Sequence, residues 1–292
     1  LNSYVISEKI WTMKILVVIV LYKLKLGNVV PLQSLRKQLS EYNNRIGFYI
    51  YDNSPVGDEE CLHKVELYGS PFKYVSDISN PGLSKAYNEA CQYAQNSGYD
   101  WLLLLDQDTT LPMDALYKYF NGIDSKQEFN MFVPKVKVEG RGYMSPCVFK
   151  HKRGRFMDDF PSGKVETKNI TVINSGLLIR VESYKACGGY DNSVYLDFND
   201  HDFFYRFKKL NPYIYVIDTE FQQDFTCLST NMDMLKKRFV ILCECVRAIK
   251  GKSFYEKIDY FLVVFLRALH LTGLTKSFSF VKILISKYIF CQ

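Results

Sequence analysis

Short unbroken apolar runs alternate with amphipathic segments along the first third of the chain. The runs lie at 13–21, 46–51, 72–75 and 101–105. Apolar runs of this length are typical of strands buried on both faces. The segments 30–42 and 83–95 between them carry the 3.6-residue period of helices. This alternation predicts βαβ units around a parallel sheet, so we assign the chain to the α/β class.

After residue 108 the pattern changes, and helices dominate from 232 onward. In between we expect helices at 111–119 and 202–209, a basic loop at 150–155, and strands at 129–138, 143–149, 171–180 and 213–217. The apolar segments 257–271 and 278–291 are interrupted by Arg267, Lys282 and Lys287. Neither is therefore expected to span a membrane. The expected organisation is a main domain at 13–226 with a helical extension at 227–292, preceded by a separate extension at 1–12.

Positive charge is concentrated in the C-terminal part. The formal net charge is +6, but residues 236–292 hold eleven Lys and Arg against three acids, a local +8. Between 276 and 291, cationic and apolar residues fall on opposite sides of a helical wheel. This favours an anionic membrane surface as partner over nucleic acid, for which no motif appears. The alternative is an ordinary helix packed on its own domain.

The cysteines and histidines predict no metal or disulfide site. The eight Cys form no CxxC pair, the four His are scattered, and no signal peptide is recognisable. Reduced, mostly buried thiols in a cytoplasmic protein are the expectation. Motifs GxGxxG, GxxxxGK[ST] and GxSxG are absent from the sequence. Their absence disfavours dinucleotide redox chemistry, P-loop phosphoryl transfer and the α/β-hydrolase class.

Two carboxylates directly follow the strand at 101–105. Asp106 and Asp108 would lie at the carboxyl edge of the sheet, where open α/β folds bind ligands. Two desolvated carboxylates favour a cation, and oxygen ligands suit Mg²⁺ or Mn²⁺, which commonly also hold substrate phosphates. The alternative is that these Asp residues cap a helix that starts near Pro112.

Three further polar signals accompany this pair. Asp52 ends the second strand, where it can bind a base or ribose, or simply form a turn. Asn80-Pro81-Gly82 opens a helix whose N-terminal amides suit phosphate, or caps it. The segment 197–202 is densely acidic, and Asp202 and Arg206 are spaced as a plain i,i+4 ion pair.

In this order the motifs resemble the inverting family-two glycosyltransferases of the GT-A fold, over residues 14–226. On the donor side, the strand that ends at Tyr22, the turn at Asp52 and the motif Asn80-x-Gly82 with Lys85 are similar to the family's nucleotide-binding elements. Asp106-Gln107-Asp108 is similar to its D-x-D metal motif. The resemblance implies a Rossmann-like, mostly parallel sheet flanked by helices, and a Mg²⁺ or Mn²⁺ cofactor.

On the acceptor side, Asn174-Ser175-Gly176 resembles the family's acceptor strand, and Asp200-x-Asp202 with Arg206 resembles the signature that carries the general base. The resemblance therefore implies Asp200 as base, with Asp197 in support. Two residues depart from the pattern. Asn199 stands where Glu is common, and Gln223 stands near the place of a metal-binding His, for which its amide oxygen is a weaker substitute.

The form of these motifs resembles the rhamnosyltransferase and galactofuranosyltransferase branch of surface-polysaccharide assembly. That resemblance implies a donor such as dTDP-rhamnose, UDP-galactofuranose or a UDP-hexose, and a lipid-linked saccharide acceptor at the inner face of the cell membrane. Two alternatives stay open. One is a non-catalytic partner protein that binds sugar nucleotides, and the other is a sugar nucleotidyltransferase.

Overall fold

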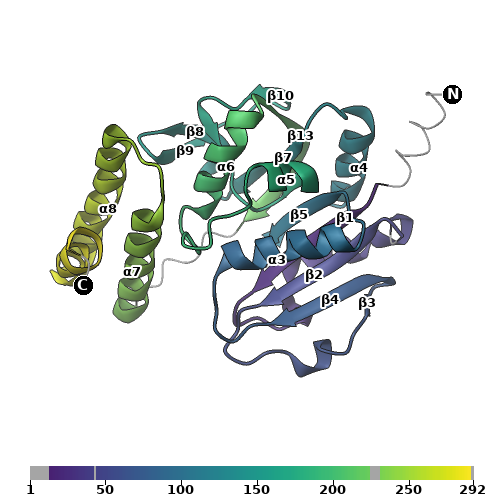
Figure 1. The fold of residues 1–292 in the computed structure, drawn as a ribbon, viewed down its shortest axis with the longest axis horizontal. Helices are drawn as coiled ribbons and strands as arrows, with labels where there is room; N and C mark the ends of the chain where they lie inside the picture. The colour runs from purple at the N-terminus through teal and green to yellow at the C-terminus, as the bar shows by residue number, and fades with distance from the viewer. Residues whose placement is uncertain (1–12, 43, 224–230, 291–292) are drawn as a thin grey trace.

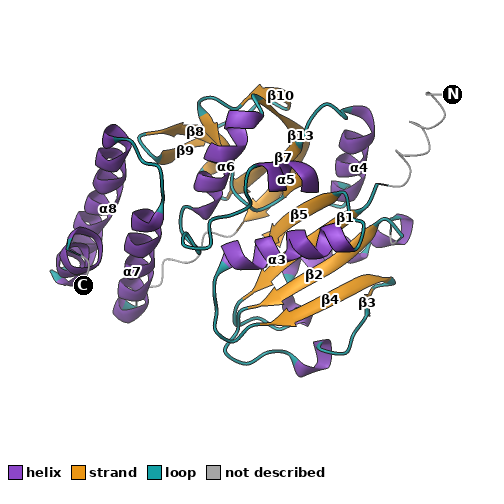
Figure 2. Ribbon diagram, in the orientation of Figure 1, coloured by secondary structure: helices purple, strands orange, loops and turns teal. Residues whose placement is uncertain are grey.

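One mixed sheet runs through the molecule (Figure 1, Figure 2). The computed structural model describes residues 13–42, 44–223 and 231–290, so the expected extension at 1–12 and the start of the C-terminal part lie outside the described residues. Within them the strand order is β10-β13-β7-β12-β5-β1-β2-β4-β3, and β6, β8, β9 and β11 attach beside this path. The strands are β1 (Ile15–Leu21), β2 (Ile46–Asp52), β3 (Glu66–Leu67), β4 (Ser70–Ser76), β5 (Trp101–Asp106), β6 (Thr109–Thr110), β7 (Met131–Val138), β8 (Gly142–Lys150), β9 (Arg153–Met157), β10 (Gly163–Glu166), β11 (Ile170–Thr171), β12 (Leu177–Arg180) and β13 (Tyr213–Gln223).

The sheet is parallel in its first half and mixed in its second. β1 pairs in parallel with β2 and β5, and β2 pairs in parallel with β4. β12 then inserts antiparallel between β5 and β7. This change follows the change in sequence pattern after residue 108, and it confirms the expected α/β class with a mostly parallel sheet.

Helices cover both faces of the sheet because its central strands are buried on both sides. Along β5, Trp101, Leu103 and Leu105 belong to one core, which also holds side chains of α2 and α4. Leu102 and Leu104 belong to the other core, with α3, α5 and α6. The helices are α2 (Val30–Arg36), α3 (Leu83–Asn96), α4 (Ala115–Ser125), α5 (Val181–Ala186), α6 (Asn199–Leu210), α7 (Met232–Ala248), α8 (Phe254–Thr275) and α9 (Ser279–Ile283). The six described cysteines are free and buried, as expected.

Several element boundaries differ from the sequence predictions. The helix expected at 30–42 ends at Arg36 and is followed by a 3₁₀ turn, Leu39–Glu41. The helix expected from residue 111 starts at Ala115, with Asp114 as its N-cap, and the preceding Thr109 and Thr110 pair with β13. The basic loop expected at 150–155 is instead a tight hairpin, in which His151 and Lys152 form the turn and the other residues belong to β8 and β9. Tertiary pairing outweighs local propensity at these positions.

The C-terminal helices form a third core at one end of the molecule (Figure 1). Ser253 and Glu256 make a reciprocal capping box at the start of α8, which contributes about 1 kcal/mol in typical helices. Part of the segment expected to be amphipathic, 278–291, packs inward: Phe280 and Leu284 are buried in this core. At Phe280 and Leu284 the segment therefore packs on the protein itself, as the alternative interpretation expected.

Helix α8 corrects a second expectation about this region. It runs for 22 residues, and an 18-residue window in it has a mean hydropathy of 1.4, so by length and composition it can cross a membrane. Only 22% of that window is buried inside the protein. Arg267 argues against a span, but the other three charges of α8, Glu256, Lys257 and Asp259, lie near its start, so the rest of the helix stays apolar.

Candidate functional site

The predicted donor-side residues meet at the carboxyl edge of the parallel strands. The register pairs Leu21 with Asp52 and Val20 with Asp106, which places both carboxylates at the same end of the sheet. The loops that follow these strands are tied together. Tyr22 N–H donates to Oε1 of Gln107 at 2.9 Å. Gln107, which the sequence offered only as the middle residue of the D-x-D motif, thus links Tyr22 to the carboxylate pair.

Asp52 is buried and fully engaged within the protein. Its Oδ1 accepts from Ser54 N–H at 2.8 Å, and its Oδ2 accepts from the hydroxyl of Tyr74 at 2.5 Å. Both the turn-forming alternative and a position beside a ligand are compatible with this geometry. Its contact with a base therefore stays a prediction. Tyr74, on the neighbouring strand β4, had no signal in the sequence beyond its place in an apolar run.

The start of α3 is held against the segment that precedes α6. Gly82 has φ +92°, and a Cβ there would lie 2.3 Å from the carbonyl oxygen of Tyr195, so only glycine fits. Leu83 N–H donates to that same oxygen at 2.8 Å. Asn80, also at positive φ, is exposed just before this contact. The two halves of the predicted site are thereby joined.

Lys85 pairs with a carboxylate that the sequence prediction missed. Its Nζ lies 2.9 Å from Oδ2 of Asp77, which also accepts from the hydroxyl of Tyr51 at 2.8 Å. Hydrogen bonds from Ser79, Lys85 and Tyr51 hold the pKa of Asp77 well below its usual range. Asp77 follows β4 directly, and an acid just after a strand was the available signal. Lys85 keeps 40% of its side chain exposed, and its contact with a phosphate stays a prediction.

Asp106, Asp108 and Gln223 form the candidate metal centre. The pairing of Gln223 with Thr109 brings the end of β13 beside the carboxylates. Nε2 of Gln223 donates to Oδ2 of Asp106 at 3.2 Å. Burial raises the pKa of Asp106 to about 7, and the negative charges of Asp108 and Asp200 add to this shift. These charges would be relieved by a cation.

The donor set fits a divalent ion of the Mg²⁺ or Mn²⁺ type. Oε1 of Gln223 is buried and has no hydrogen-bond partner among the described residues. A buried amide oxygen without a donor is unfavourable, and a hard cation would satisfy it together with the two carboxylates. The described residues contain no cluster of three or more His, Cys, Asp or Glu that could hold a metal, and among them Gln223 would add an amide oxygen to the two carboxylates. The helix-capping alternative is wrong, since Asp114 is the N-cap of α4.

Asp200 lies in the first turn of α6, next to this centre. Phe198, the N-cap of α6, has φ +67°, a left-handed conformation that is rare for an aromatic residue and that starts the helix abruptly. Asp200 is one fifth exposed, and its charge contributes to the raised pKa of Asp106. A partly exposed carboxylate close to the metal centre has the properties of a general base.

Asn174 and Ser175 lie beneath α6 and do not line an open surface. Nδ2 of Asn174 donates to Asn199 at 3.3 Å, and its Oδ1 accepts from Tyr190 at 2.5 Å. Ser175 exchanges a hydrogen bond with Thr109 at 2.5 Å. Both residues are buried. They therefore hold the first turn of α6 and the D-x-D turn in place, and a direct acceptor contact stays a prediction.

The other acidic residues of this segment are engaged in ion pairs. Arg206 donates from Nε and Nη2 to Asp202 Oδ2 at 3.2 and 2.9 Å, which is the i,i+4 pair of the sequence alternative. Asp197 pairs with Arg238 of α7. Burial raises the pKa of Asp197 even though Arg238 opposes that shift. Asp197 thus links this segment to α7, and a role of Asp197 and Asp202 in support of Asp200 stays a prediction.

Comparison with known proteins agrees with this architecture. The curated dTDP-rhamnosyl transferase RfbF of Shigella flexneri is 24% identical over 210 residues, which cover 68% of this chain and 65% of that protein. The structure of GalNAc-T7 with UDP, GalNAc and Mn²⁺ superposes with a TM-score of 0.58 at 14% identity, covering 85% of this chain and 50% of that one. S. aureus TarS 1-349 in complex with UDP-GlcNAc gives a TM-score of 0.55 at 15% identity, covering 88% and 73%.

These structures confirm the expected GT-A fold. The chain corresponds to about two thirds of the curated relative and half of GalNAc-T7, so it matches only part of each. The family model of Glycosyl transferase family 2 matches residues 31–186, which is more than half of the chain and contains Asp52, Lys85, Asp106 and Asp108, whereas Tyr22 and Gln223 lie outside it. The chain therefore belongs to glycosyl transferase family 2.

Proposed function

We propose that this protein is an inverting glycosyltransferase that moves a sugar from a nucleotide-diphosphate sugar to a hydroxyl of a saccharide acceptor. One observation carries the proposal. Asp106, Asp108 and Gln223 converge at the sheet edge, and Asp200 lies close enough for its charge to raise the pKa of Asp106. A metal-binding carboxylate pair beside a separate carboxylate supplies the two functions that the reaction needs.

The donor would lie along the edge formed by β1, β2 and β5. Asp52 and Tyr22 would contact the nucleoside, while Lys85 and the start of α3 would face the phosphates. Asp106, Asp108 and Gln223 would hold the metal. When bound, the metal supplies positive charge that stabilises the leaving nucleotide diphosphate. The name of the relative RfbF favours dTDP-rhamnose as the first donor to test, with UDP-sugars second.

Asp200 would remove the proton of the acceptor hydroxyl. As that oxygen forms its bond to the anomeric carbon, the bond from this carbon to the diphosphate breaks on the opposite side, and the configuration inverts. The electron pair of the broken bond leaves with the nucleotide diphosphate, and the proton remains on Asp200. This single displacement needs one base and no enzyme nucleophile, which agrees with the one carboxylate available on α6.

A donor panel tests this proposal against the two alternatives. With Mn²⁺, dTDP-rhamnose, UDP-galactofuranose and UDP-hexoses should give slow hydrolysis or transfer for at least one donor, which mass spectrometry would detect. If the protein binds these nucleotide sugars but neither hydrolyses them nor transfers their sugar to candidate acceptors, it is a non-catalytic binding protein. Release of pyrophosphate from a sugar phosphate and a nucleoside triphosphate would identify a nucleotidyltransferase and contradict the proposal.

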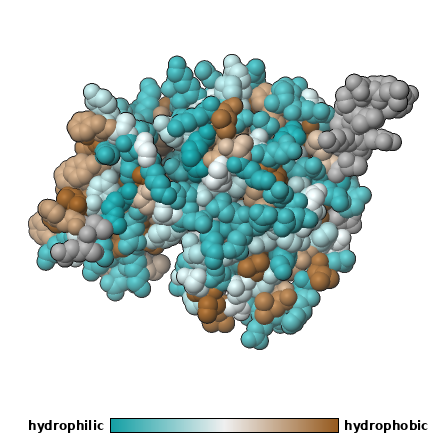
Figure 3. Space-filling model, in the orientation of Figure 1, coloured by the Kyte–Doolittle hydropathy of each residue, from teal (hydrophilic) through white to brown (hydrophobic). Residues whose placement is uncertain are grey.

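We also propose that α8 holds the protein on an anionic membrane, where a lipid-linked acceptor would be presented. Ile258, Leu262, Leu266 and Leu269 share one face of α8, and each is 42–45% exposed. This face lies opposite the helix's buried side. Apolar residues gather over α8 at the edge of the molecule (Figure 3). A contiguous apolar surface of this kind is typical of an interaction site.

Charge and cysteine chemistry support the identity of this partner. The region 236–292 carries a local charge of +8. Each Lys or Arg near an anionic surface contributes about 1 kcal/mol, and salt weakens this attraction. The free, buried cysteines agree with a reducing compartment, so we place the protein at the cytoplasmic face of the membrane.

Replacing Leu262 and Leu266 with Glu in one variant should weaken binding to phosphatidylglycerol vesicles at least tenfold. In the proposed complex the two partly exposed leucines are buried in the bilayer, and each contributes about 1 kcal/mol to binding. The change removes this contribution and adds negative charge that an anionic bilayer repels. Vesicle flotation measures the bound fraction. Wild-type binding should fall in high salt without disappearing.

The control for this variant is Leu62→Glu. Leu62 is 52% exposed and precedes β3, at the opposite end of the molecule from α8 (Figure 1). The control should bind vesicles like the wild type. Equal binding of wild-type protein to neutral and anionic vesicles would remove the electrostatic part of the proposal. Unchanged binding of the double variant would exclude the apolar face of α8.

A further inference from the structure

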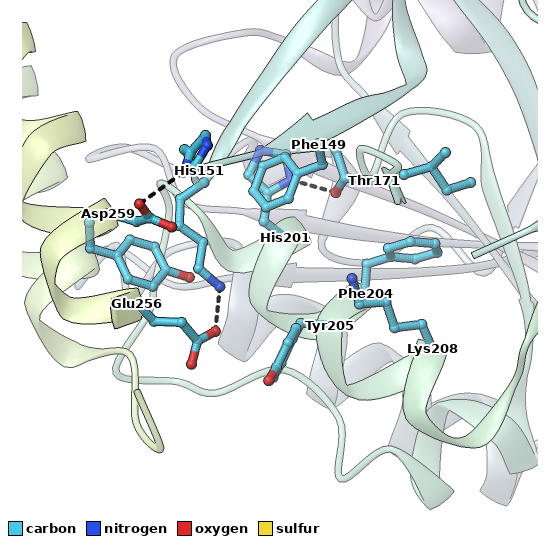
Figure 4. A pocket seen from close by; sticks show the side chains of 12 residues that line it. Phe149, His151, Thr171, His201, Phe204, Tyr205, Lys208, Glu256 and Asp259 are labelled. Atoms are coloured by element: carbon cyan, nitrogen blue, oxygen red, sulfur yellow. Dashed lines mark hydrogen bonds and ion pairs between the residues drawn. The ribbon is translucent and has the colours of Figure 1, made fainter. Parts of the chain in front are cut away.

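A pocket of about 200 Å³ lies between α6, the β8–β9 turn and α8 (Figure 4). It is separate from the donor edge and was not predicted from the sequence. Aromatic rings contribute to its wall from three elements: Phe149 on β8, Tyr205 on α6 and Tyr260 on α8. The C-terminal helices, which lie outside the family match at 31–186, therefore complete a cavity of the main domain.

The turn that forms one wall has a strained backbone and is tied to α8. His151 and Lys152 both have positive φ, 49° and 56°, in a two-residue hairpin turn that usually takes Asn or Gly. Nδ1 of His151 lies 3.1 Å from Asp259, and Nζ of Lys152 lies 2.6 Å from Glu256. Figure 4 shows both pairs bridging the turn and the helix. Backbone strain of this kind is often found at functional sites.

The pocket adjoins the candidate base. His201 lines it, and its Nδ1 lies 2.8 Å from Oγ1 of Thr171 on the facing strand β11. The residue before it is Asp200, whose Oδ1 accepts from His201 N–H at 2.7 Å. The pocket wall and the candidate base are therefore consecutive residues in the first turn of α6. From Asp200, the path through His201 and the pocket leads toward the residues of α8 that line the other side.

The charges of the pocket indicate a neutral ligand. Lys152 and Lys208 are balanced by Glu256 and Asp259, so a diphosphate would meet two carboxylates as well as two ammonium groups. Such a mixture offers both donors and acceptors, which matches the hydroxyl groups of a sugar. Aromatic rings with a few convergent polar groups are typical of small-molecule sites. The small volume limits the ligand to about one ring.

We propose that this pocket binds one neutral sugar residue of the acceptor, the unit next to the one whose hydroxyl faces Asp200. The inference rests on the proposed glycosyltransferase function and names a second acceptor contact for it. The rings of Phe149, Tyr205 and Tyr260 contact the C–H faces of the sugar, and the charged side chains bind its hydroxyls. The acceptor then runs from Asp200 toward the apolar face of α8, where its lipid would enter the membrane.

The test uses the full-length protein and a panel of p-nitrophenyl glycosides of rhamnose, galactose, glucose and N-acetylglucosamine. Saturation-transfer NMR should detect at least one of them, and Tyr205→Ala should weaken that binding at least tenfold. Tyr213→Ala is a matched control. Tyr213 is 42% exposed and Tyr205 is 38% exposed, and each has a lysine above its ring. The control should bind like the wild type.

A second variant guards against an effect on folding. Asp259→Asn keeps the size of the side chain but changes its hydrogen bonding, and it should also weaken the glycoside signal. The proposal would be overturned if the wild type bound no glycoside. It would also be overturned if Tyr205→Ala and Asp259→Asn both bound glycoside as well as the wild type does. Displacement of the glycoside by inorganic phosphate would overturn it too, because it would indicate an anion site. Titration of dTDP and UDP with Mn²⁺ on the same samples tests the donor site. Absent nucleotide binding would contradict the proposed function, whereas absent glycoside binding with normal nucleotide binding would contradict only the proposal for the pocket.

Discussion

Replacing Asp106 or Asp108 with Ala should abolish the metal-dependent binding of a nucleotide diphosphate, and sugar transfer with it. Each change removes one of the two carboxylates at the end of β5, and the remaining Asp and the amide oxygen of Gln223 are too few to hold the ion. Calorimetric titration of dTDP or UDP with and without Mn²⁺ measures the effect. Unchanged metal-dependent binding in both variants would contradict the proposed site.

The pKa of Asp106 gives this prediction a pH dependence. Burial and the charge of Asp108 raise that pKa to about 7, so at pH 6 the carboxyl group of Asp106 is protonated in most molecules. This proton must leave before a metal binds. Metal-dependent binding in the wild type should therefore be weaker at pH 6 than at pH 8. A carboxyl group with an ordinary pKa would be ionised at both values and would show little difference.

Two further variants separate metal binding from other effects. Asp114→Ala removes a carboxylate near the same strand but outside the site, where its side chain is 55% exposed, and it should bind metal and nucleotide normally. Gln223→Ala should weaken metal binding, because its Oε1 is then missing. Gln223→His restores a stronger ligand and should bind at least as well as the wild type. If Gln223→Ala has no effect, the amide is not a ligand.

The position of the carboxylate pair could be predicted because its signals were local, while its role in binding a metal stays a prediction. An apolar run of strand length followed by Asp106 and Asp108 needs no tertiary information, and the structure places both at the sheet edge. Gln223 could be suspected only from the resemblance. Its contact with Asp106 depends on the pairing of β13 with β6, between residues more than a hundred positions apart. Such long-range pairing leaves no trace in local periodicity.

The residues that hold the site were harder to predict for a different reason. Tyr74 and Tyr190 look like ordinary core aromatics in the sequence, and only their hydroxyl bonds to Asp52 and Asn174 distinguish them. The C-terminal helices show the same limit. Their composition predicted amphipathic helices correctly, but which face packs inward depended on partners. Phe280 belongs to the core, while Ile285, Phe290 and one face of α8 keep apolar side chains exposed.

Asp200→Asn should preserve the fold and donor binding but reduce sugar transfer by roughly 10² to 10⁴, the usual contribution of a general base. The amide has nearly the same shape and can still accept the hydrogen bond from His201 N–H, so the first turn of α6 should remain in place. It cannot take a proton from the acceptor hydroxyl at neutral pH. Transfer to an active acceptor, measured by mass spectrometry, should therefore fall, while the affinity for dTDP or UDP with Mn²⁺ stays near that of the wild type.

Asp202→Asn is the comparison that makes this result specific. Asp202 lies in the same turn of α6, but its carboxylate is engaged by Arg206 at 2.9 Å. An ion pair of this spacing contributes about 0.3–0.5 kcal/mol to helix stability, so its loss should lower the melting temperature slightly and leave most transfer activity. If Asp200→Asn turns over like the wild type and Asp202→Asn does not, the base is Asp202 and Asp200 is structural. If both variants lose transfer while their donor binding is unchanged, the two carboxylates act as a unit. Asp200 would then accept the proton only when the ion pair of Asp202 and Arg206 is intact.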